Sequence, residues 1–431
     1  MKLKKSKLQG SPKDPSRWDV IFYDRISRGV LYLSHPEMKE PVPLLEQWLR
    51  DACTCPSCVD PSSGQKLFST CDLPDKTHIK SARKTEDGSL EVTWKDDFHT
   101  FDDHVSVYPR EQIEYYLGNI PDVPKTEYTD LRLWNRAELE ELNPFYDYDE
   151  FMTGGETYVR ALSMMCTRGL FFLRNVPQDK ESVERIAEKL GIIYESFYGR
   201  TWDVVSKPNA ENVAYTNSYL GLHADLLYMR NPPRLQLLHC LKNTCEGGSS
   251  LFSDGLRARF ALQGMYPAAV EVLRQRRIMY WYHKNGIQRC KWHPVFGGNL
   301  DVLWSPPFQS PEQEIRKSKQ GSYFYLDWLK AARKFRDLLE DEKSLYEYKL
   351  QPGDCAVFNN LRVLHGRRAF DTSEGERWLR GTYVEDESFI DKVRQHAAVL
   401  PKEGYVPMAL QVEKYFSEPK VQYRFKYNND E

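Results

Sequence analysis

Short runs of alternating or continuous apolar residues, separated by turn residues, fill most of the chain after Gly199. Runs of this length and composition are typical of β-strands. The segments that we predict as strands are residues 212–219, 235–243, 249–255, 277–284, 301–308, 355–366 and 379–386. One longer segment, residues 322–343, has apolar residues at helical spacing and interrupts the strands. Many short strands with a helix packed outside predict a mainly β, jelly-roll domain with flanking helices.

Two helical patterns and a buried strand precede this region. Residues 154–169 and 180–191 are predicted as helices, and each ends on a glycine that can terminate a helix. Between them, residues 170–176 form a continuous apolar run, which is typical of a strand covered on both faces. We therefore expect helices that flank the β domain.

The first part of the chain has a different organisation. Its predicted strands are residues 19–25, 29–34 and 89–97. A helical or extended segment leads into a tight cysteine cluster within residues 43–58. We expect a small α+β domain over residues 1–120, a proline-spaced linker over 121–136 and the β domain over 137–431.

Composition excludes several classes of protein. Hydrophobic residues make up 41% and charged residues 28% of the chain, as in folded globular proteins. The net charge is −2 and charges of both signs are interspersed, which argues against a nucleic-acid partner. No segment approaches the roughly 18 apolar residues of a membrane span, and the basic N-terminus lacks a secretory signal. We expect a cytoplasmic protein, with a mitochondrial presequence as the alternative, and nine cysteines that serve as thiols or metal ligands.

The strongest candidate chemistry starts at His223 and Asp225. They are two residues apart in an apolar run, the spacing that directs two side chains to one face of a strand. Non-haem Fe(II) oxygenases bind iron with two histidines and one carboxylate, and leave the remaining coordination positions open. His365, which closes a predicted strand about 140 residues later, is the candidate third ligand. The order and spacing of the three residues predict an iron site.

Arg377 follows His365 by twelve residues. Its planar guanidinium can hold a carboxylate with two hydrogen bonds, which suits a dicarboxylate co-substrate. The other end of 2-oxoglutarate would bind the iron through its keto and carboxylate oxygens. The sequence therefore predicts an oxygenase that uses Fe(II) and 2-oxoglutarate.

Alternative interpretations remain open for these residues. A lone His-x-Asp pair is more commonly a solvated or hydrogen-bonded pair than a metal site. His239 is the nearest competing histidine and is interpreted as a core residue, while His283 and His293 lack a carboxylate two residues away. A protein of another class, a catalytically silent jelly-roll binding protein, would also contain such strands.

Several longer segments make a resemblance to a known family specific. They are "WLRDACTCPSC", "FYGRTWDV", "NVAYTNSYLGLHADLLY", "PPRLQLLHCLKNTCEGG" and "VLHGRRAF". From about residue 40 to about residue 390 the chain resembles the gamma-butyrobetaine hydroxylase and trimethyllysine hydroxylase family of Fe(II)/2-oxoglutarate oxygenases, and it is more similar to the former. The resemblance implies a double-stranded β-helix catalytic domain preceded by a small zinc-binding domain.

The resemblance also implies roles for individual residues. It implies that the iron ligands are His223, Asp225 and His365. It implies that 2-oxoglutarate is bound by Arg377, with the hydroxyl of Ser250 as a helper. Arg380 is the alternative carboxylate partner.

A zinc site is predicted in the N-terminal domain. Cys53, Cys55 and Cys58 bring three thiolates together within six residues, and a closed structural zinc site needs a fourth ligand. The family supplies a histidine in a pattern that "FDDHVSVY" matches at His104, while His99 is the rival. The alternative is three free cysteines in a loop, which would be exposed to oxidation.

The resemblance further implies an aromatic cage for a trimethylammonium group. A quaternary ammonium donates no hydrogen bond, so ring faces recognise it through cation–π contacts. The matching positions are Tyr198, Trp202, Tyr215 and Tyr383, and Asn212 matches a residue that holds the substrate carboxylate.

The opposite end of the expected substrate site departs from the family pattern. Leu226 stands where a tyrosine is usual, and Trp304 and Ser305 stand where amides are expected. Each hydrogen bond that a buried carboxylate loses costs about 1–3 kcal/mol. This difference indicates a related substrate with another tail, or a rebuilt carboxylate site.

The predicted activity is hydroxylation of a small trimethylammonium substrate, with gamma-butyrobetaine converted to carnitine as the first choice. The alternative is the same oxygenase chemistry on another small amine, amino acid or secondary metabolite. The expected cofactors are Fe(II), 2-oxoglutarate and structural Zn(II), with ascorbate as reductant. The expected partners are the small-molecule substrate and O2, without nucleic acid or membrane, and the resemblance suggests a homodimer.

Overall fold

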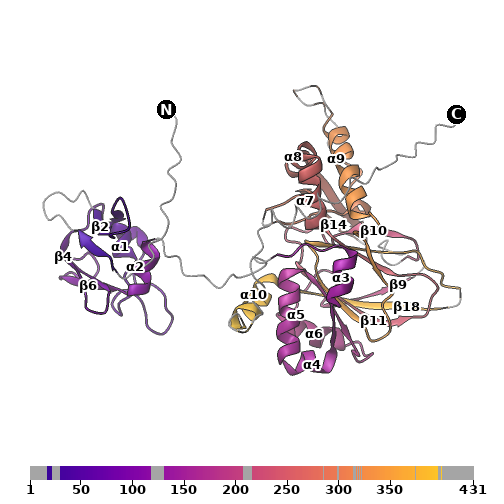
Figure 1. The fold of residues 1–431 in the computed structure, drawn as a ribbon, viewed down its shortest axis with the longest axis horizontal. Helices are drawn as coiled ribbons and strands as arrows, with labels where there is room; N and C mark the ends of the chain where they lie inside the picture. The colour runs from indigo at the N-terminus through magenta and orange to yellow at the C-terminus, as the bar shows by residue number, and fades with distance from the viewer. Residues whose placement is uncertain are drawn as a thin grey trace. The chain divides into compact units, whose positions relative to one another are not determined.

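The computed structural model describes residues 17–21, 30–117, 131–206, 216–396 and 399, except for 285, 299, 314–316, 318, 320, 322 and 374. The chain divides into two compact units, residues 1–123 and 124–431 (Figure 1). Each unit has apolar core clusters of its own. In the described ranges, no helix combines the length and the apolar composition that crossing a bilayer requires.

Two three-stranded antiparallel sheets form the described part of the N-terminal unit. Their strands are β1 (Asp19–Ile21), β2 (Val30–Ser34) and β3 (Val42–Leu45), and β4 (Ile79–Lys84), β5 (Leu90–Trp94) and β6 (His104–Tyr108). Helices α1 (Glu46–Asp51) and α2 (Arg110–Tyr116) accompany them. In β5 every second residue is buried, so Leu90, Val92 and Trp94 build the core. This confirms the predicted α+β character; residues 22–25 of the first predicted strand lie outside the described residues.

Two sheets also form the catalytic unit, with strand orders β7-β8-β16-β11-β18-β9 and β10-β17-β12-β15. The strands of the larger sheet are β7 (Phe145–Asp147), β8 (Leu170–Arg174), β9 (Thr201–Val205), β11 (Leu235–Asn243), β16 (Cys355–Asn359) and β18 (Arg377–Val384). Those of the smaller sheet are β10 (Leu220–His223), β12 (Ser250–Asp254), β15 (Tyr346–Tyr348) and β17 (Val363–Arg367). Phe172, Phe252 and Phe358 pack between the sheets. The predicted mainly β, jelly-roll fold is confirmed.

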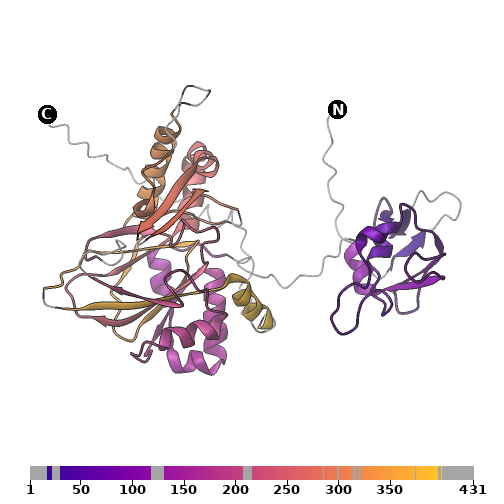
Figure 2. The same ribbon diagram turned by 180° about the vertical axis from the view of Figure 1, so that it is seen from behind.

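Helices cover the outer face of the larger sheet. They are α4 (Tyr148–Thr153), α5 (Glu156–Thr167), α6 (Ser182–Leu190) and α10 (Asp386–Gln395), while α3 (Arg136–Leu142) precedes β7. Figures 1 and 2 both show α4, α5 and α6 on one side of this unit. Their apolar side chains share a core with β8, β11 and β16, which explains why these strands are apolar on both faces.

A helical insertion forms the other end of the unit, visible from both sides in Figures 1 and 2. It contains α7 (Gly255–Met265), α8 (Pro267–Gln275), the hairpin β13 (Arg277–Lys284) and β14 (Ile287–Pro294), the 3-10 turn η4 (Pro306–Phe308) and α9 (Phe324–Leu339). The predicted helix at 322–343 corresponds to α9, but α7 and α8 were not predicted. Pro267 starts α8 at a position that needs no backbone N–H.

Three predicted strands have a different structure. Of residues 212–219, only 216–219 are described, and they precede β10 without forming a strand. Residues 355–366 form two strands, β16 in the larger sheet and β17 in the smaller one, with a turn at Asn360 between them. Residues 301–308 contain one isolated bridge at Val302 and then the turn η4. Two consecutive prolines without N–H groups prevent a continued strand there.

The predicted linker over 121–136 overlaps the catalytic unit. Residues 118–130 lie outside the described residues, but Leu131, Leu133 and Trp134 are buried in the catalytic core. Arg362 holds this segment by donating to the Arg132 carbonyl oxygen. Residues 131–136 are therefore packed structure and do not separate the two units.

Candidate functional site: an iron-ligand triad and a cysteine cluster

The three predicted iron ligands converge at one point. His223 ends β10, and His365 in β17 is its direct cross-strand partner, with 4.2 Å between the ring centroids. The spacing had suggested that Asp225 lies in the same strand as His223. The structure places it instead in the turn that follows β10. Its Oδ1 atom is 3.3 Å from Nε2 of His223 and 4.0 Å from Nε2 of His365. One ion can therefore contact all three ligand atoms.

Hydrogen bonds on the far side of His223 and of Asp225 leave the ligand atoms of these two residues available. Nδ1 of His223 donates to the carbonyl oxygen of Gly221 at 2.9 Å, which leaves Nε2 with its lone pair. The other carboxylate oxygen of Asp225, Oδ2, accepts hydrogen bonds from Gln236 at 2.7 Å and Tyr383 at 2.8 Å. The donor set, two imidazole nitrogens and one carboxylate oxygen, is one that suits Fe(II).

Electrostatics favour the protonation states that bind a metal. Burial lowers the pKa of His365 to about 3, so the ring is neutral near pH 7. Burial alone would raise the pKa of Asp225, but the neighbouring His223 and His365 and the hydrogen bond from Tyr383 lower it below its usual range. The triad thus presents a neutral His365 imidazole and an ionised Asp225 carboxylate.

Arg377 and Ser250 line the same cavity as the triad. Arg377 is 5% exposed, and its Nε donates to the carbonyl oxygen of Gly248 at 3.3 Å. Arg380 does not line the cavity, because alternate residues of β18 face opposite sides. It donates instead to Asp203 and Thr201. Of the two candidates, only Arg377 is placed to hold the distal carboxylate of 2-oxoglutarate.

Three of the four predicted cage residues line this cavity, namely Tyr198, Trp202 and Tyr383. Trp202 stacks on Tyr383 with 4.2 Å between centroids and 28° between planes. The stack requires Gly381, where a β-carbon would lie 2.6 Å from the indole. Asn212 and Tyr215 lie outside the described residues.

The cavity also has walls that the sequence did not predict. Tyr228 and Phe308 line it, and the Phe308 ring centroid is 5.9 Å from that of His223. Leu226 lines it as well, whereas Trp304 and Ser305 are buried outside it. No pattern in the sequence marks Phe308, which the turn η4 directs inward from a segment predicted as a strand.

Arg367 and Gln236 are two further cavity residues that sequence reasoning missed. Arg367 follows His365 by two positions on β17, so the strand period could have placed it on the same face. It donates to the carbonyl oxygens of Thr216 and Ser218. For Gln236, the sequence feature that could have found it is a polar residue between two leucines of β11.

The competing histidines lie away from the triad. His239 is fully buried in β11 outside the cavity, as interpreted from the sequence. His283 contacts Gln288 across the β13–β14 hairpin, and His293 lies on β14 of the same hairpin. None of the three is close enough to join the iron ligands.

The predicted zinc ligands also come together, in the N-terminal unit. Nε2 of His104 is 3.4 Å from the sulfur of Cys53, 3.6 Å from that of Cys55 and 3.5 Å from that of Cys58. Zinc bonds of about 2.3 Å to sulfur and about 2.1 Å to nitrogen at tetrahedral angles place S and N about 3.5 Å apart. The Cys3His cluster therefore fits zinc.

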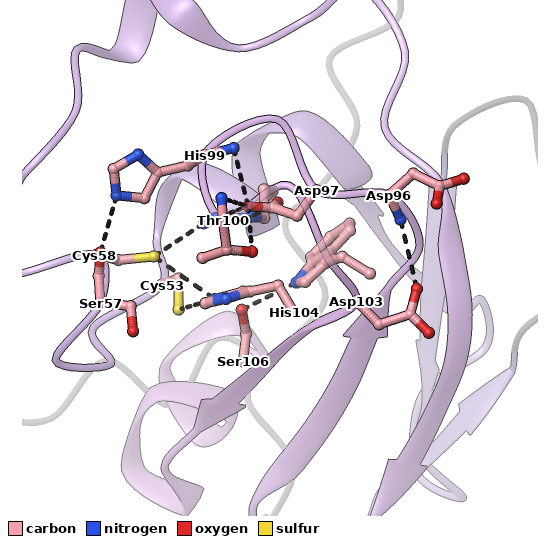
Figure 3. A network of polar contacts seen from close by, with 12 residues as sticks. Cys53, Ser57, Cys58, Asp96, Asp97, His99, Thr100, Asp103, His104 and Ser106 are labelled. Carbon is pink, nitrogen blue, oxygen red and sulfur yellow. Dashed lines mark hydrogen bonds and ion pairs between the residues drawn. The ribbon is translucent and has the colours of Figure 1, made fainter.

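His99 is not part of this cluster. Figure 3 shows the sulfur atoms of Cys53 and Cys58 beside the His104 ring, while His99 points away toward Ser57. Nε2 of His99 is 2.9 Å from the carbonyl oxygen of Ser57. The structure thus favours His104 over its rival as the fourth ligand.

A buried arginine borders the cysteine cluster. Arg50, fully buried at the end of α1, donates to the sulfur of Cys58 at 3.3 Å. It also donates twice to Asp97, at 2.6 and 2.8 Å. Burial alone would raise the pKa of Asp97, but the hydrogen bonds from Arg50 hold it at about 2. A permanent cation therefore lies against the sulfur of Cys58.

Comparison with known proteins assigns both units to families. Residues 146–383 match the taurine catabolism dioxygenase TauD, TfdA family, and residues 39–109 match the gamma-butyrobetaine hydroxylase-like N-terminal domain. The first range contains all three iron ligands, and the second contains all four residues of the Cys3His cluster.

Full-length relatives give the same assignment. Dioxygenase str8 of Strobilurus tenacellus is 35% identical, covering 83% of this chain and 85% of that protein. Gamma-butyrobetaine dioxygenase of Pseudomonas sp. (strain AK-1) is 28% identical, covering 81% and 90%. Trimethyllysine dioxygenase of Meyerozyma guilliermondii is 26% identical, covering 80% and 88%. The chain therefore belongs to the TauD/TfdA family, in its gamma-butyrobetaine and trimethyllysine hydroxylase branch, and is a non-haem Fe(II)/2-oxoglutarate-dependent dioxygenase.

Proposed function

We propose that this dioxygenase hydroxylates a small trimethylammonium compound, with gamma-butyrobetaine, which would become carnitine, as the first candidate substrate. The observation that carries the proposal is the aromatic wall beside the triad. Tyr198, Trp202 and Tyr228 line the cavity that contains the iron ligands. Ring faces attract a quaternary ammonium by about 0.5–2 kcal/mol per contact. The gamma-butyrobetaine and trimethyllysine dioxygenases among the relatives support the same substrate class.

In this proposal the protein contributes mainly position. Iron and 2-oxoglutarate, when bound, would supply the oxidising chemistry together with O2, one atom of which goes into succinate as CO2 is lost and the other into the product hydroxyl. His223, Asp225 and His365 hold the metal, and Arg377 holds the distal carboxylate of 2-oxoglutarate by charge and hydrogen bonding. The aromatic wall selects which carbon of the substrate faces the metal, and this selection sets the product.

The test is turnover of purified protein with Fe(II), 2-oxoglutarate, ascorbate and a panel of trimethylammonium compounds. We expect succinate formation coupled one-to-one to hydroxylation of a trimethylammonium compound, followed by mass spectrometry. We also expect turnover to decline without ascorbate, as iron becomes oxidised. Succinate formation that no member of the panel stimulates would reject the cation as the recognised group.

A second candidate is the same chemistry on another small amine, amino acid or secondary metabolite. Two observations favour it. Identity to dioxygenase str8 is 35%, against 28% to the Pseudomonas gamma-butyrobetaine dioxygenase. The described cavity wall also presents Leu226 and Phe308, which cannot hydrogen-bond a carboxylate tail. Succinate release coupled to a small amine, amino acid or secondary metabolite without a trimethylammonium group, and not to gamma-butyrobetaine, would favour this candidate.

For the N-terminal unit we propose a structural zinc ion bound by the Cys3His cluster. Metal analysis of protein purified without added zinc should give about one zinc per chain, as expected for a closed four-ligand site. A homodimer also remains a prediction, and light scattering would measure it.

A further inference from the structure

Asp225 makes more hydrogen bonds than iron binding requires. Both of its carboxylate oxygens and both of its backbone polar groups have partners in the fold. We propose that Tyr383 and Gln236 are positioning residues of the iron site, which occupy one oxygen of Asp225 so that only the other can bind the metal. This assigns Tyr383 to the iron centre, whereas the family pattern assigns it to the substrate cage.

The two donors act as a matched pair. Gln236 in β11 and Tyr383 in β18 are direct cross-strand partners, so their side chains leave the sheet side by side toward Asp225. Each residue is 1% exposed. The Gln236 amide nitrogen donates at 2.7 Å and the Tyr383 hydroxyl at 2.8 Å, both to Oδ2. Two neutral donors on one oxygen stabilise a negative charge there and keep that oxygen away from the metal.

The backbone of Asp225 is fixed independently. The side chain of fully buried Asn360 accepts from the Asp225 N–H at 2.7 Å and donates to the Asp225 carbonyl oxygen at 3.2 Å. The next residue, Leu226, has φ of 59°, a conformation that costs a non-glycine residue about 1–3 kcal/mol. The surrounding structure holds this turn in place, so the backbone of Asp225 is fixed, and the two hydrogen bonds to Oδ2 then hold its carboxylate in one orientation.

Single-oxygen binding matters for this class of enzyme. Three protein ligands leave room for the bidentate co-substrate and for O2, whereas a carboxylate that binds through both oxygens would take a fourth position. The hydroxyl of Tyr383 is committed to Asp225, and Trp202 covers one face of its ring. Tyr383 can therefore contribute to the substrate site only through the rest of its ring.

The test measures iron binding and needs no substrate, so it is independent of the proposed function. Tyr383→Phe and Gln236→Leu each remove one donor to Oδ2. The matched control is Tyr280→Phe, which removes a buried tyrosine hydroxyl bonded to the Leu303 carbonyl oxygen, outside the cavity. Fe(II) is titrated anaerobically with 2-oxoglutarate present, and the visible charge-transfer band of the complex is recorded.

We expect Tyr383→Phe and Gln236→Leu to weaken Fe(II) binding by about 10-fold to about 100-fold, as other changes around metal ligands do. The band should shift in both variants, and the control should match the wild type. Unchanged iron affinity and an unshifted band in either variant would overturn the proposal for that residue. Thermal unfolding of metal-free protein is the second readout. If all three variants lose equal stability and equal iron affinity, the effect is one of packing and the proposal is rejected.

Discussion

The two metal-ligand clusters of this protein differ in how the chain closes around them. The Cys3His cluster supplies four candidate ligand atoms, three of them sulfur, which is the number that a closed tetrahedral zinc site takes. The triad supplies three nitrogen and oxygen atoms at the wall of a cavity. A complete shell leaves no position for a reactant, whereas an incomplete one does. The comparison teaches that the number of coordination positions left free by the protein ligands decides whether a metal site is structural or reactive.

Residues around the ligands follow the same division. At the cysteine cluster, three thiolates would carry more negative charge than one zinc ion neutralises, and Arg50 brings a positive charge next to Cys58. At the triad, the neutral donors Gln236 and Tyr383 orient Asp225 without adding charge. The cysteine cluster thus has a charged pair, Arg50 and Asp97, beside its ligands, whereas the triad has neutral donors and leaves charge to be balanced by its dianionic co-substrate.

Loss of one iron ligand should have the largest effect. We expect His365→Ala to abolish Fe(II)-dependent 2-oxoglutarate turnover while zinc content stays at wild-type level, because the two clusters belong to separate units. Metal analysis and succinate formation measure this. The control is His283→Asn, an exposed histidine on the hairpin, which should retain both metals. Loss of zinc in His365→Ala would contradict the independence of the two sites.

Removal of a zinc ligand should produce the reciprocal result. We expect Cys58→Ser to lose zinc and to unfold the N-terminal unit, since zinc binding supplies about 10 kcal/mol or more in comparable small domains. Iron binding by the catalytic unit should persist. Limited proteolysis, with Cys71→Ser as the exposed control, locates the unfolding. Resistance of the N-terminal unit in Cys58→Ser would show that its apolar core suffices without metal.

A smaller effect is expected at the co-substrate site. Arg377→Met should raise the KM for 2-oxoglutarate by about 10-fold to about 100-fold, the equivalent of losing hydrogen bonds to a charged group. Steady-state kinetics measures this change, and Arg380→Met is the matched control on the opposite face of β18. An equal change in both variants would remove the distinction between the two arginines.

The smallest effect should come from the residue beside the thiolates. Arg50→Lys keeps a positive charge but loses the planar fork that contacts Cys58 and Asp97 together, so zinc affinity should fall about tenfold. Competition with a chromogenic chelator measures it. The control is Arg83→Lys, which changes an exposed arginine of the same unit. This variant should bind zinc with wild-type affinity. Unchanged affinity in Arg50→Lys would mean that charge alone, without geometry, stabilises the cluster.

Local pattern in the sequence was sufficient for one kind of prediction. The alternation in residues 89–97, the apolar run at 170–176 and the helix at 180–191 correspond to β5, β8 and α6. Cys53, Cys55 and Cys58 lie so close along the chain that a shared metal could be predicted from spacing. These features depend on neighbours within a few residues, which the sequence shows directly.

Contacts between distant segments were harder to predict. Residues 355–366 appeared as one strand, because the sequence does not show that the chain crosses from one sheet to the other at Asn360. Phe308 enters the cavity only because η4 turns there, and Arg50 meets Asp97 across 47 residues.

The sequence by itself determined which residue types were present for each metal and the order in which they occur, since ligand chemistry is a property of side chains. Only the tertiary structure decided that Asp225 lies in a turn and that its Oδ2 atom accepts hydrogen bonds from Gln236 and Tyr383. It also decided that Arg380 points away from the cavity. The physical reason is that strand pairing and turn geometry set the direction of a side chain, and both depend on contacts between segments far apart along the chain.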